Sequence, residues 1–446
     1  MPEVRPAGPY PIEGVNLDTW LVRFDKKGVC TSPGTRAALL TALAAKPTSP
    51  VLFFSHGWNN DFTDAVDLYR TFLSRLQEVL ETNPLPPGPA PIFVGITWPS
   101  IWLPSDTGPQ MAAAGPSGQN PETERVAEEL LDILPSSTDR DRFYQLIHAA
   151  RLTHGEAMEL AGMLKPAVKA VRVGPDEAPA SEDNIVAAMN ALQAARGGAL
   201  VRDNLDDVGT VGGTGRAGPG AAGILSYLDP RWAVRLASLY IMKDRAGTVG
   251  SNGVAALLRD IKQSMQSPLH MVGHSFGAKV MLSALAAQPP GGRVRSLLLL
   301  QPAVSHLSFA ATVPGREGPG GYRSVLDRVV NPIVTTYSNH DISLHEIYHL
   351  ALLRRKDLGE LQIAAGKAGE TAAGNPPNAY AALGGYGPRG ANQRLVNTIP
   401  GPGETIDLAG TRVIGLDGSV ANRIDSHGDV ATLFTAWTLR ALMALP

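Results

Sequence analysis

Residues 269–286 read LHMVGHSFGAKVMLSALA, and their pattern changes in the middle. The apolar run at 269–272 is typical of a buried strand, and small and apolar residues recur at helical spacing after residue 277. Between them, residues 273–277 read GHSFG, a G-x-S-x-G sequence. A sharp strand-to-helix turn of this kind holds its serine in a strained conformation, with the hydroxyl exposed above the end of a sheet. The stretch therefore predicts a nucleophilic Ser275 on a sheet wrapped by helices.

Segments on both sides of this stretch fit the same sheet. A continuous apolar run such as 51–54 is typical of a strand buried on both faces, and helical segments lie between several of the strand-like segments. Strand, helix and strand joined by short loops favour a parallel sheet flanked by helices. The predicted strands are 19–24, 51–54, 92–98, 269–272, 294–300, 333–337 and one within 405–416, and the predicted helices of the same layer are 35–45, 62–80, 254–265 and 430–445.

A long stretch interrupts this alternation. Residues 99–246 contain helical patterns joined by polar and glycine-rich linkers, and residues 355–403 form a second, loose insertion rich in Gly, Ala, Pro and Asn. We therefore expect one α/β domain, made of residues 1–98 and 247–446, with 99–246 inserted as a large helical cap or lid. The helices predicted in that insertion are 122–134, 142–164, 182–196 and 232–244.

Composition narrows the class of protein. The 446 residues carry a formal net charge of −2, which implies neither a nucleic-acid nor an anionic-membrane partner. A single cysteine leaves no internal disulfide framework. The N-terminal residues lack the basic and apolar regions of a signal peptide, and no apolar run approaches the ~20 residues of a membrane helix. We expect a soluble cytoplasmic protein; the oligomeric state stays open.

A serine nucleophile needs a base within hydrogen-bond reach and an acid that orients the base. On parallel α/β sheets these partners follow later strands in the order Ser, acid, His. Asp341 follows the strand predicted at 333–337, and His427 lies in a loop after the last predicted strand. Asp327 and Asp407 follow no convincing strand. We therefore expect Asp341 to be the acid and His427 the base.

Simpler roles exist for the same side chains. Asp341 is also well placed to cap a helix that begins near Ser343, and His427 to be an ordinary histidine of a surface loop. His274, beside the serine, is expected to pack or hydrogen-bond within the turn. The sequence leaves these alternatives open.

Acyl transfer also needs two donors for the developing oxyanion. The backbone N–H of Phe276, at the start of the helix after the turn, is one natural donor. The other is expected from the loop after an earlier strand, where Gly57 lets the backbone approach a substrate and the N–H of Trp58 follows. The alternative is that Trp58 and Asn59 are packing and turn residues.

At this point the chain resembles the α/β-hydrolase superfamily, in particular its esterases and lipases. The matching segments are FFSHGWNN at 53–60, ITWPS at 96–100, HMVGHSFGAK at 270–279, NHD at 339–341 and SHGD at 426–429. The resemblance covers roughly residues 17–100, 247–350 and 404–446, and the long insertion departs from the compact family pattern.

The resemblance implies the α/β-hydrolase fold, a triad of Ser275, Asp341 and His427, no cofactor, and cleavage of carboxylic esters through an acyl-enzyme. The expected substrate is a small-molecule ester or a lipid-like one, because the apolar helix faces of the insertion suggest a hydrophobic acyl group. The same scaffold also hosts amidases and thioesterases.

A zinc hydrolase is the main alternative. Residues 345–349 read HEIYH, and on a helix His345 and His349 share one face and suit zinc, with Glu346 as general base. A third ligand is not obvious: Leu352 replaces the glycine of the metzincin spacing, and Glu370 lies in a Gly/Ala-rich stretch.

Two further hypotheses are weaker. Residues 213–218 match G-x-G-x-x-G, but no strand precedes them and Pro219 follows, so we interpret them as a linker. A non-catalytic scaffold has no physical need to keep a serine, an aspartate and a histidine together in this order.

Overall fold

The computed structural model resolves two compact units. One comprises residues 1–101, 242–349 and 358–446, and the other comprises residues 102–241 and 350–357. The residues described are 8–58, 60–100, 137–147, 149, 151–168, 182, 185–190, 231–265, 267–314, 318–351, 372–378 and 380–445.

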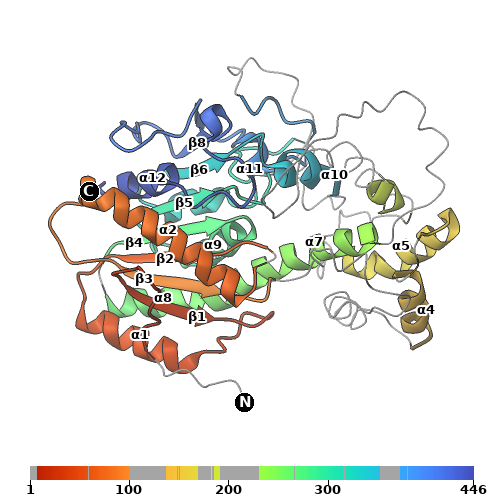
Figure 1. The fold of residues 1–446 in the computed structure, drawn as a ribbon, viewed down its shortest axis with the longest axis horizontal. Helices are drawn as coiled ribbons and strands as arrows, with labels where there is room; N and C mark the ends of the chain where they lie inside the picture. The colour runs from red at the N-terminus through yellow and green to blue at the C-terminus, as the bar shows by residue number, and fades with distance from the viewer. Residues whose placement is uncertain are drawn as a thin grey trace. The chain divides into compact units, whose positions relative to one another are not determined.

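The first unit is built on an eight-stranded sheet in the order β1-β3-β2-β4-β5-β6-β8-β7. Every pair of neighbouring strands runs parallel (Figure 1). The predicted α/β class and mostly parallel sheet are thus confirmed. The strands are β1 (Asp18–Arg23), β2 (Val51–Ser55), β3 (Ile92–Thr97), β4 (Leu269–His274), β5 (Ser296–Leu300), β6 (Ile333–Tyr337), β7 (Arg394–Val396) and β8 (Val413–Asp417).

Helices cover both faces of this sheet. On one face α2 (Phe62–Thr82) packs beside α12 (Leu433–Met443), and on the other α1 (Pro33–Ala45), α8 (Ala255–Ser264) and α9 (Phe276–Ala286) lie together (Figure 1). A capping box between Asp61 and Asp64 begins α2. The strands from β2 to β6 and β8 are buried along their whole length, as expected for a parallel sheet covered on both faces.

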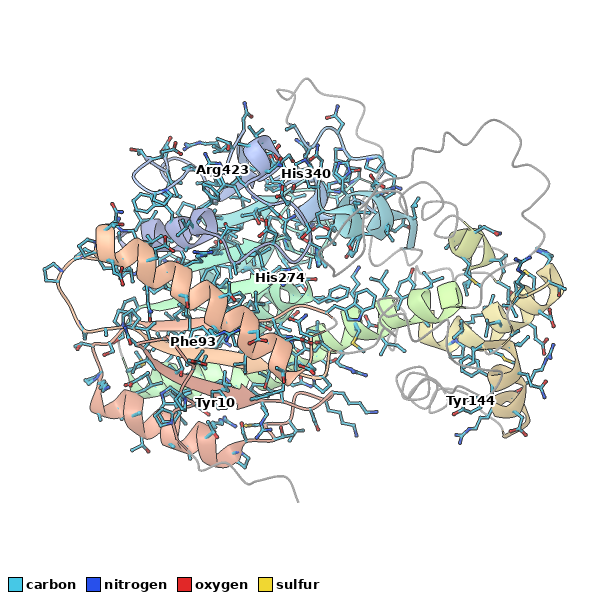
Figure 2. All side chains as sticks on the ribbon, in the orientation of Figure 1. Tyr10, Phe93, Tyr144, His274, His340 and Arg423 are labelled. Atoms are coloured by element: carbon cyan, nitrogen blue, oxygen red, sulfur yellow. The ribbon has the colours of Figure 1, made fainter. Side chains whose placement is uncertain are left out.

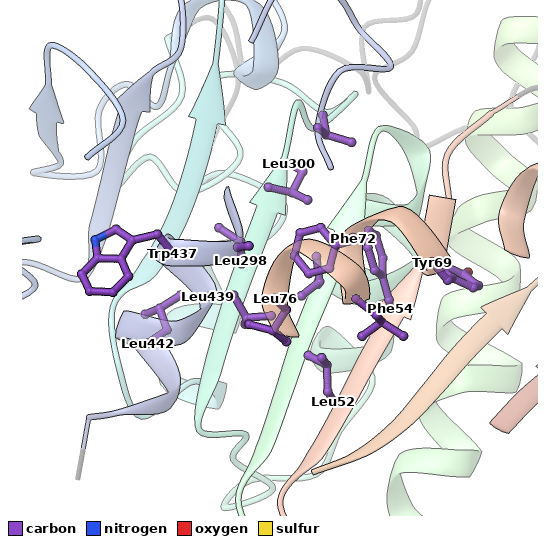
Figure 3. Packing of buried hydrophobic residues seen from close by; sticks show 14 of the residues in the cluster. Leu52, Phe54, Tyr69, Phe72, Leu76, Leu298, Leu300, Trp437, Leu439 and Leu442 are labelled. Atoms are coloured by element: carbon purple, nitrogen blue, oxygen red, sulfur yellow. The ribbon is translucent and has the colours of Figure 1, made fainter. Parts of the chain in front are cut away.

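The core under α2 and α12 is aromatic and aliphatic (Figure 3). Phe54 of β2 meets Phe72 of α2 edge to face, with ring centroids 5.0 Å apart. Both side chains are fully buried, and burying a side chain of this size contributes about 1.5–3 kcal/mol. This packing holds β2 inside the sheet, and it therefore also fixes where the loop after β2 begins.

In the second unit, the helix predicted at 142–164 is two helices, α4 (Ser137–Ile147) and α5 (His154–Val168). Thr153 explains the break: its hydroxyl accepts from the amide of Glu156 at 3.3 Å, and the Glu156 carboxylate accepts from the Thr153 amide at 2.9 Å. These contacts start a new helix. The carboxylate of Glu159 then ties α5 to Arg142 of α4. The helix predicted at 122–134 lies outside the described residues, and of 182–196 only 182 and 185–190 are described.

Three other elements differ from the sequence expectation. The helix predicted at 232–244 extends as α7 (Arg231–Thr248) and runs through a π-helical turn, Val249–Val254, into α8. Within the stretch expected to be loose, β7 joins the edge of the sheet beside β8, and the short α11 (Leu383–Tyr386) precedes it. Strand β7 has only three half-buried residues, so no apolar run marks it.

Candidate active site

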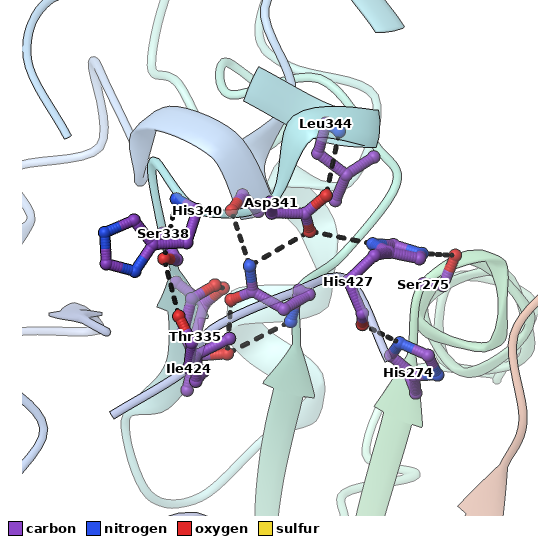
Figure 4. Close-up of polar contacts among 12 residues, drawn as sticks. His274, Ser275, Thr335, Ser338, His340, Asp341, Leu344, Ile424 and His427 are labelled. Atoms are coloured by element: carbon purple, nitrogen blue, oxygen red, sulfur yellow. Dashed lines mark hydrogen bonds and ion pairs between the residues drawn. The ribbon is translucent and has the colours of Figure 1, made fainter. Parts of the chain in front are cut away.

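The strands of a parallel sheet end at the same edge, and three predicted residues follow three of those ends. Ser275 comes directly after β4, Asp341 four residues after the end of β6, and His427 ten residues after the end of β8. The structure brings them together (Figure 4). The Nε2 of His427 is 2.8 Å from the Oγ of Ser275, and its Nδ1 is 2.7 Å from the Oδ2 of Asp341. The predicted serine, histidine and aspartate therefore form one hydrogen-bonded chain.

The backbone of Ser275 is strained and held in place. Its φ is 55° and its ψ −124°, a conformation that costs a non-glycine residue about 1–3 kcal/mol. The amide of Ser275 donates to the carbonyl of Leu300 at 3.0 Å, and its carbonyl accepts from the amide of Ala303 at 3.2 Å. Leu300 is the last residue of β5 and Ala303 lies three residues beyond it, so β5 and the loop after it keep the serine in this turn.

The two glycines of the G-x-S-x-G sequence leave room for close backbone packing. A Cβ at Gly273 would stand 2.6 Å from the Cα of Ala278, and one at Gly277 would stand 2.1 Å from the carbonyl oxygen of Ser55. Either contact is closer than atoms tolerate. The turn thus presses α9 against β4 and against the end of β2, which brings the loop after β2 to the serine.

Asp341 is fully buried and accepts hydrogen bonds through both carboxylate oxygens. Its Oδ1 accepts from the amide of Leu344 at 2.9 Å, and its Oδ2 accepts from His427 and, at 3.0 Å, from the Nε2 of Gln301. The two roles considered for Asp341 therefore coexist: it caps the turn that follows it and also contacts His427.

Gln301 was not foreseen as a site residue. Its φ is 43°, and its amide group is used completely: Nε2 donates to Asp341 and to the carbonyl of Gly384, while Oε1 accepts from the hydroxyl of Thr336. The one available signal is its place, directly after β5 at the edge where Ser275 and Asp341 also lie.

The electrostatics of His427 depend on its carboxylate partner. Burial opposes protonation of the ring, but the charge and hydrogen bond of Asp341 outweigh it, so the pKa of His427 is raised above the ordinary 6.5. Because the carboxylate accepts at Nδ1, the neutral ring carries its proton there. The free lone pair of Nε2 then faces the Ser275 hydroxyl, as general-base catalysis requires.

His274 is the last residue of β4 and is labelled in Figure 2. Its Nε2 is 2.9 Å from the carbonyl oxygen of His427. A carbonyl only accepts, so Nε2 donates and carries the proton. Burial, with the nearby His427 as a smaller cause, lowers the pKa of His274 to about 3. His274 is thus a neutral hydrogen-bond donor to the backbone of the histidine loop.

The loop after β2 reaches the serine as predicted for a second oxyanion donor. A Cβ at Gly57 would stand 2.6 Å from the Cβ of Ser275, and the rings of Trp58 and Phe276 lie 5.9 Å apart. Phe276 is the first residue of α9, so its amide has no carbonyl acceptor inside the helix. The donor roles of the Trp58 and Phe276 amides stay predictions, and Asn59 lies outside the described residues.

His56 secures that loop. Its Nε2 accepts from the amide of Trp98 at 3.2 Å, and its Nδ1 lies 3.0 Å from the carbonyl of Gly57, to which it donates. The ring stacks on Trp98 with centroids 5.6 Å apart. Burial lowers the pKa of His56 to about 4, so the ring stays neutral. The loop that carries Gly57 and Trp58 is therefore bound to the end of β3.

The HEIYH segment adopts a geometry different from a regular helix. Ser343–Ile347 is a π-helical turn that continues into α10 (Tyr348–Ala351). The Nε2 of His345 donates to the carbonyl of Ala373 at 2.8 Å, and its ring stacks on Tyr386. Among the residues that the structure describes, no group of three or more His, Cys, Asp or Glu is placed to hold a metal ion. Leu352 and Glu370 lie outside them.

Comparisons with protein-family models, with curated proteins and with solved structures return no match for this chain. None of the helices in the described ranges combines the length and apolar character that crossing a bilayer needs.

Proposed function

We propose that this protein is a serine hydrolase of the α/β-hydrolase type that cleaves carboxylic esters through an acyl-enzyme. One observation carries the proposal: the unbroken chain from the Ser275 hydroxyl through the His427 ring to the Asp341 carboxylate, with heavy-atom distances of 2.8 and 2.7 Å. A nucleophile, a base and an orienting acid within these distances define the machinery of acyl transfer.

In the first half of the reaction, the Nε2 of His427 takes the proton of Ser275 as the Oγ attacks the ester carbonyl. The imidazolium that forms faces the Asp341 carboxylate, whose charge stabilises it. His427 then gives this proton to the leaving alcohol, and the acyl group stays on Ser275. Water, deprotonated by the same nitrogen, hydrolyses the acyl-enzyme and restores the serine.

The developing negative charge on the carbonyl oxygen needs donors near the serine. We assign the backbone N–H groups of Phe276 and Trp58 to this role. The first lies at the start of α9, and the second follows Gly57, whose backbone approaches the Ser275 side chain. Removing one such donor typically costs about 3–4 kcal/mol of transition-state stabilisation.

For the substrate, we propose an ester with a hydrophobic acyl group. The support is the apolar pattern of the helical segments in the sequence of the 99–246 insertion. A panel of p-nitrophenyl esters from acetate to palmitate, with matched thioesters and anilides, tests this directly. Higher kcat/KM for anilides or thioesters would reassign the protein to amidases or thioesterases on the same serine.

Labelling with a fluorophosphonate probe tests the serine itself. Wild-type protein is expected to be labelled and hydrolytic, and Ser275→Ala to lose both properties. Ser283→Ala, which removes a part-buried hydroxyl from α9 that pairs with Tyr322, serves as the control and is expected to keep both. Activity that survives Ser275→Ala and disappears with a chelator would favour the zinc hypothesis on His345 and His349.

A further inference from the structure

The dipeptide His274-Ser275 contacts His427 at two separate points. The ring of His274 donates from Nε2 to the backbone carbonyl of His427 at 2.9 Å, while the hydroxyl of Ser275 lies 2.8 Å from the Nε2 of the His427 side chain (Figure 4). The two contacts come from adjacent residues of one chain segment and reach the backbone and the ring tip of one histidine. Together they close a ring of interactions around the base.

We propose that His274 is a positioning residue for acyl transfer, which sets the distance between His427 and Ser275 through its hydrogen bond to the His427 backbone. The inference rests on the proposed function. His427 sits in a loop ten residues beyond the last strand of the sheet, β8, and loops place side chains less precisely than strands do. His274 transfers the position of the central strand β4 to that loop.

The surroundings of His274 fit this role better than simple packing does. The side chain is buried, and its Nδ1 has no hydrogen-bond partner among the described residues. The hydrogen bond to the His427 carbonyl is therefore the one hydrogen bond that the ring makes with the described residues. The ring centroids of His274 and His427 are 5.1 Å apart, and because His274 stays neutral it places no second charge beside the imidazolium.

Asp341 holds the ring of His427 and other contacts hold the two ends of its loop, whereas His274 contacts the backbone of His427 itself. The hydroxyl of Ser338 donates to the carbonyl of Ile424 at 3.0 Å, three residues before His427. On the other side, the hydroxyl of Thr435 donates to the carbonyl of Val430. His274 is thus the contact at the centre of the span.

Three variants separate positioning from packing. His274→Phe keeps a ring of similar size and removes the donor, whereas His274→Gln places an amide N–H near the position of Nε2. The matched control is His270→Phe: His270 is buried on the same strand and pairs with the Ser296 hydroxyl at 2.8 Å, away from the site. Each variant is labelled with the fluorophosphonate probe over a range of probe concentrations, beside Ser275→Ala.

For His274→Phe we expect the maximal labelling rate to fall about 10- to 100-fold, the effect of a sub-ångström to ångström misplacement of a catalytic group, with little change in the half-saturating probe concentration. His274→Gln should recover most of that rate, and His270→Phe should label at the wild-type rate. A wild-type rate in His274→Phe, or an equal loss in His270→Phe, would overturn the inference and leave the proposed function intact. Absence of labelling in wild-type protein would overturn both.

Discussion

His56 and His427 follow two strands of one sheet and meet opposite surroundings. After β2, His56 has both ring nitrogens bonded to backbone groups, and burial lowers its pKa to about 4. After β8, His427 has a carboxylate at one nitrogen and a hydroxyl at the other, and the carboxylate raises its pKa in spite of burial. A protonated state is therefore accessible to His427 near neutral pH and inaccessible to His56.

The difference shows that the hydrogen-bond partners of a histidine decide whether it serves as a fixed structural contact or can exchange a proton. Backbone partners accept or donate in one fixed way, so they hold an imidazole in its neutral form as a rigid link; His56 and His274 are held so. We call these two residues the neutral region. An ionised partner stabilises the charged form as well, so the ring can exchange a proton. Asp341 and His427 form this charged region.

Asp341→Asn changes the charged region, and we expect it to have the largest effect on kcat/KM. The substitution removes the charge and offers Nδ1 of His427 a donor instead of an acceptor, which favours the wrong tautomer. If Asp341 orients His427 in catalysis as proposed, kcat/KM should fall on the order of 10³- to 10⁴-fold, as it does when the aspartate of a Ser-His-Asp triad is replaced. In wild-type protein the base is active only when neutral, so kcat/KM should rise with pH through a midpoint above about 6.5. Without the carboxylate the pKa of His427 falls, and the midpoint moves to lower pH.

The matched control for this variant is Asp417→Asn. Asp417 is also fully buried, as the last residue of β8 in the same sheet, and it accepts from the amides of Ala373 and Ser419. It should lose stability without the large drop in kcat/KM or the shift of the pH profile. Equal losses in both variants would mean that buried charge in general, and not the contact with His427, supports activity.

Gly57→Ala would place a methyl group between the neutral region and the side chain of Ser275. The added Cβ would stand 2.6 Å from the Cβ of Ser275 and 3.1 Å from the Nδ1 of His274, so the loop after β2 or the serine must shift. A shift near 1 Å at a catalytic group costs about 100-fold in rate, and we expect that loss in kcat. Gly253→Ala is the control, because its Cβ would crowd Phe24 at 2.5 Å instead. Ester hydrolysis normalised to folded protein distinguishes the two.

The strands could be predicted from sequence, and so could the meeting of Ser275, His427 and Asp341, for a physical reason. A strand buried on both faces must be continuously apolar, so 51–54, 92–98 and 333–337 stand out. Parallel strands also end at one edge of the sheet. Polar residues that follow those ends, such as Asp341 and His427, can therefore be predicted to lie close together even though the sequence gives no distances.

Gln301 and the histidine contacts were not accessible in this way. The bond of Gln301 to Asp341 joins residues 40 apart in sequence, and one glutamine after a strand has no distinguishing pattern. The role of His274 depends on where the loop carrying His427 comes to rest, 153 residues away. The break between α4 and α5 could not be predicted because two local signals compete. The apolar spacing of one helix continues through Thr153, whereas the hydrogen bonds of the Thr153 side chain favour the start of a new helix.

Gln301→Leu tests a neighbour of the charged region. Gln301 donates to the same Asp341 oxygen that accepts from His427, and hydrogen bonds to charged groups are worth about 1.5–3 kcal/mol. If that bond orients the carboxylate during catalysis, kcat/KM should fall about 10- to 100-fold. Gln288→Leu removes an equally buried amide that donates to the carbonyls of Ala255 and Ala284, and it should cost stability alone. An equal loss of activity in Gln301→Leu and Gln288→Leu would mean that the bond of Gln301 to Asp341 has no specific role in catalysis.

The buried neutral histidines, which are His56 and His274 of the neutral region and also His270 of β4, are tested by stability rather than turnover, and the effect is the smallest. Burial lowers the pKa of His56 and His270 to about 4 and that of His274 to about 3, against an ordinary 6.5. Below pH 6.5 the unfolded chain therefore binds protons that the folded chain refuses, and stability falls as the pH drops toward 4, by up to about 1.4 kcal/mol per pH unit for each such histidine. His427 has the opposite sign, since its raised pKa stabilises the folded state at low pH. Urea unfolding of His270→Phe at pH 8, 7, 6 and 5 should show a slope shallower by about that amount below pH 6.5. His427→Phe should steepen the slope only above about pH 6.5, between the unfolded pKa and the raised folded pKa of His427. Parallel slopes in wild-type protein and His270→Phe would mean that this buried histidine takes up its proton in the folded state as readily as in the unfolded one.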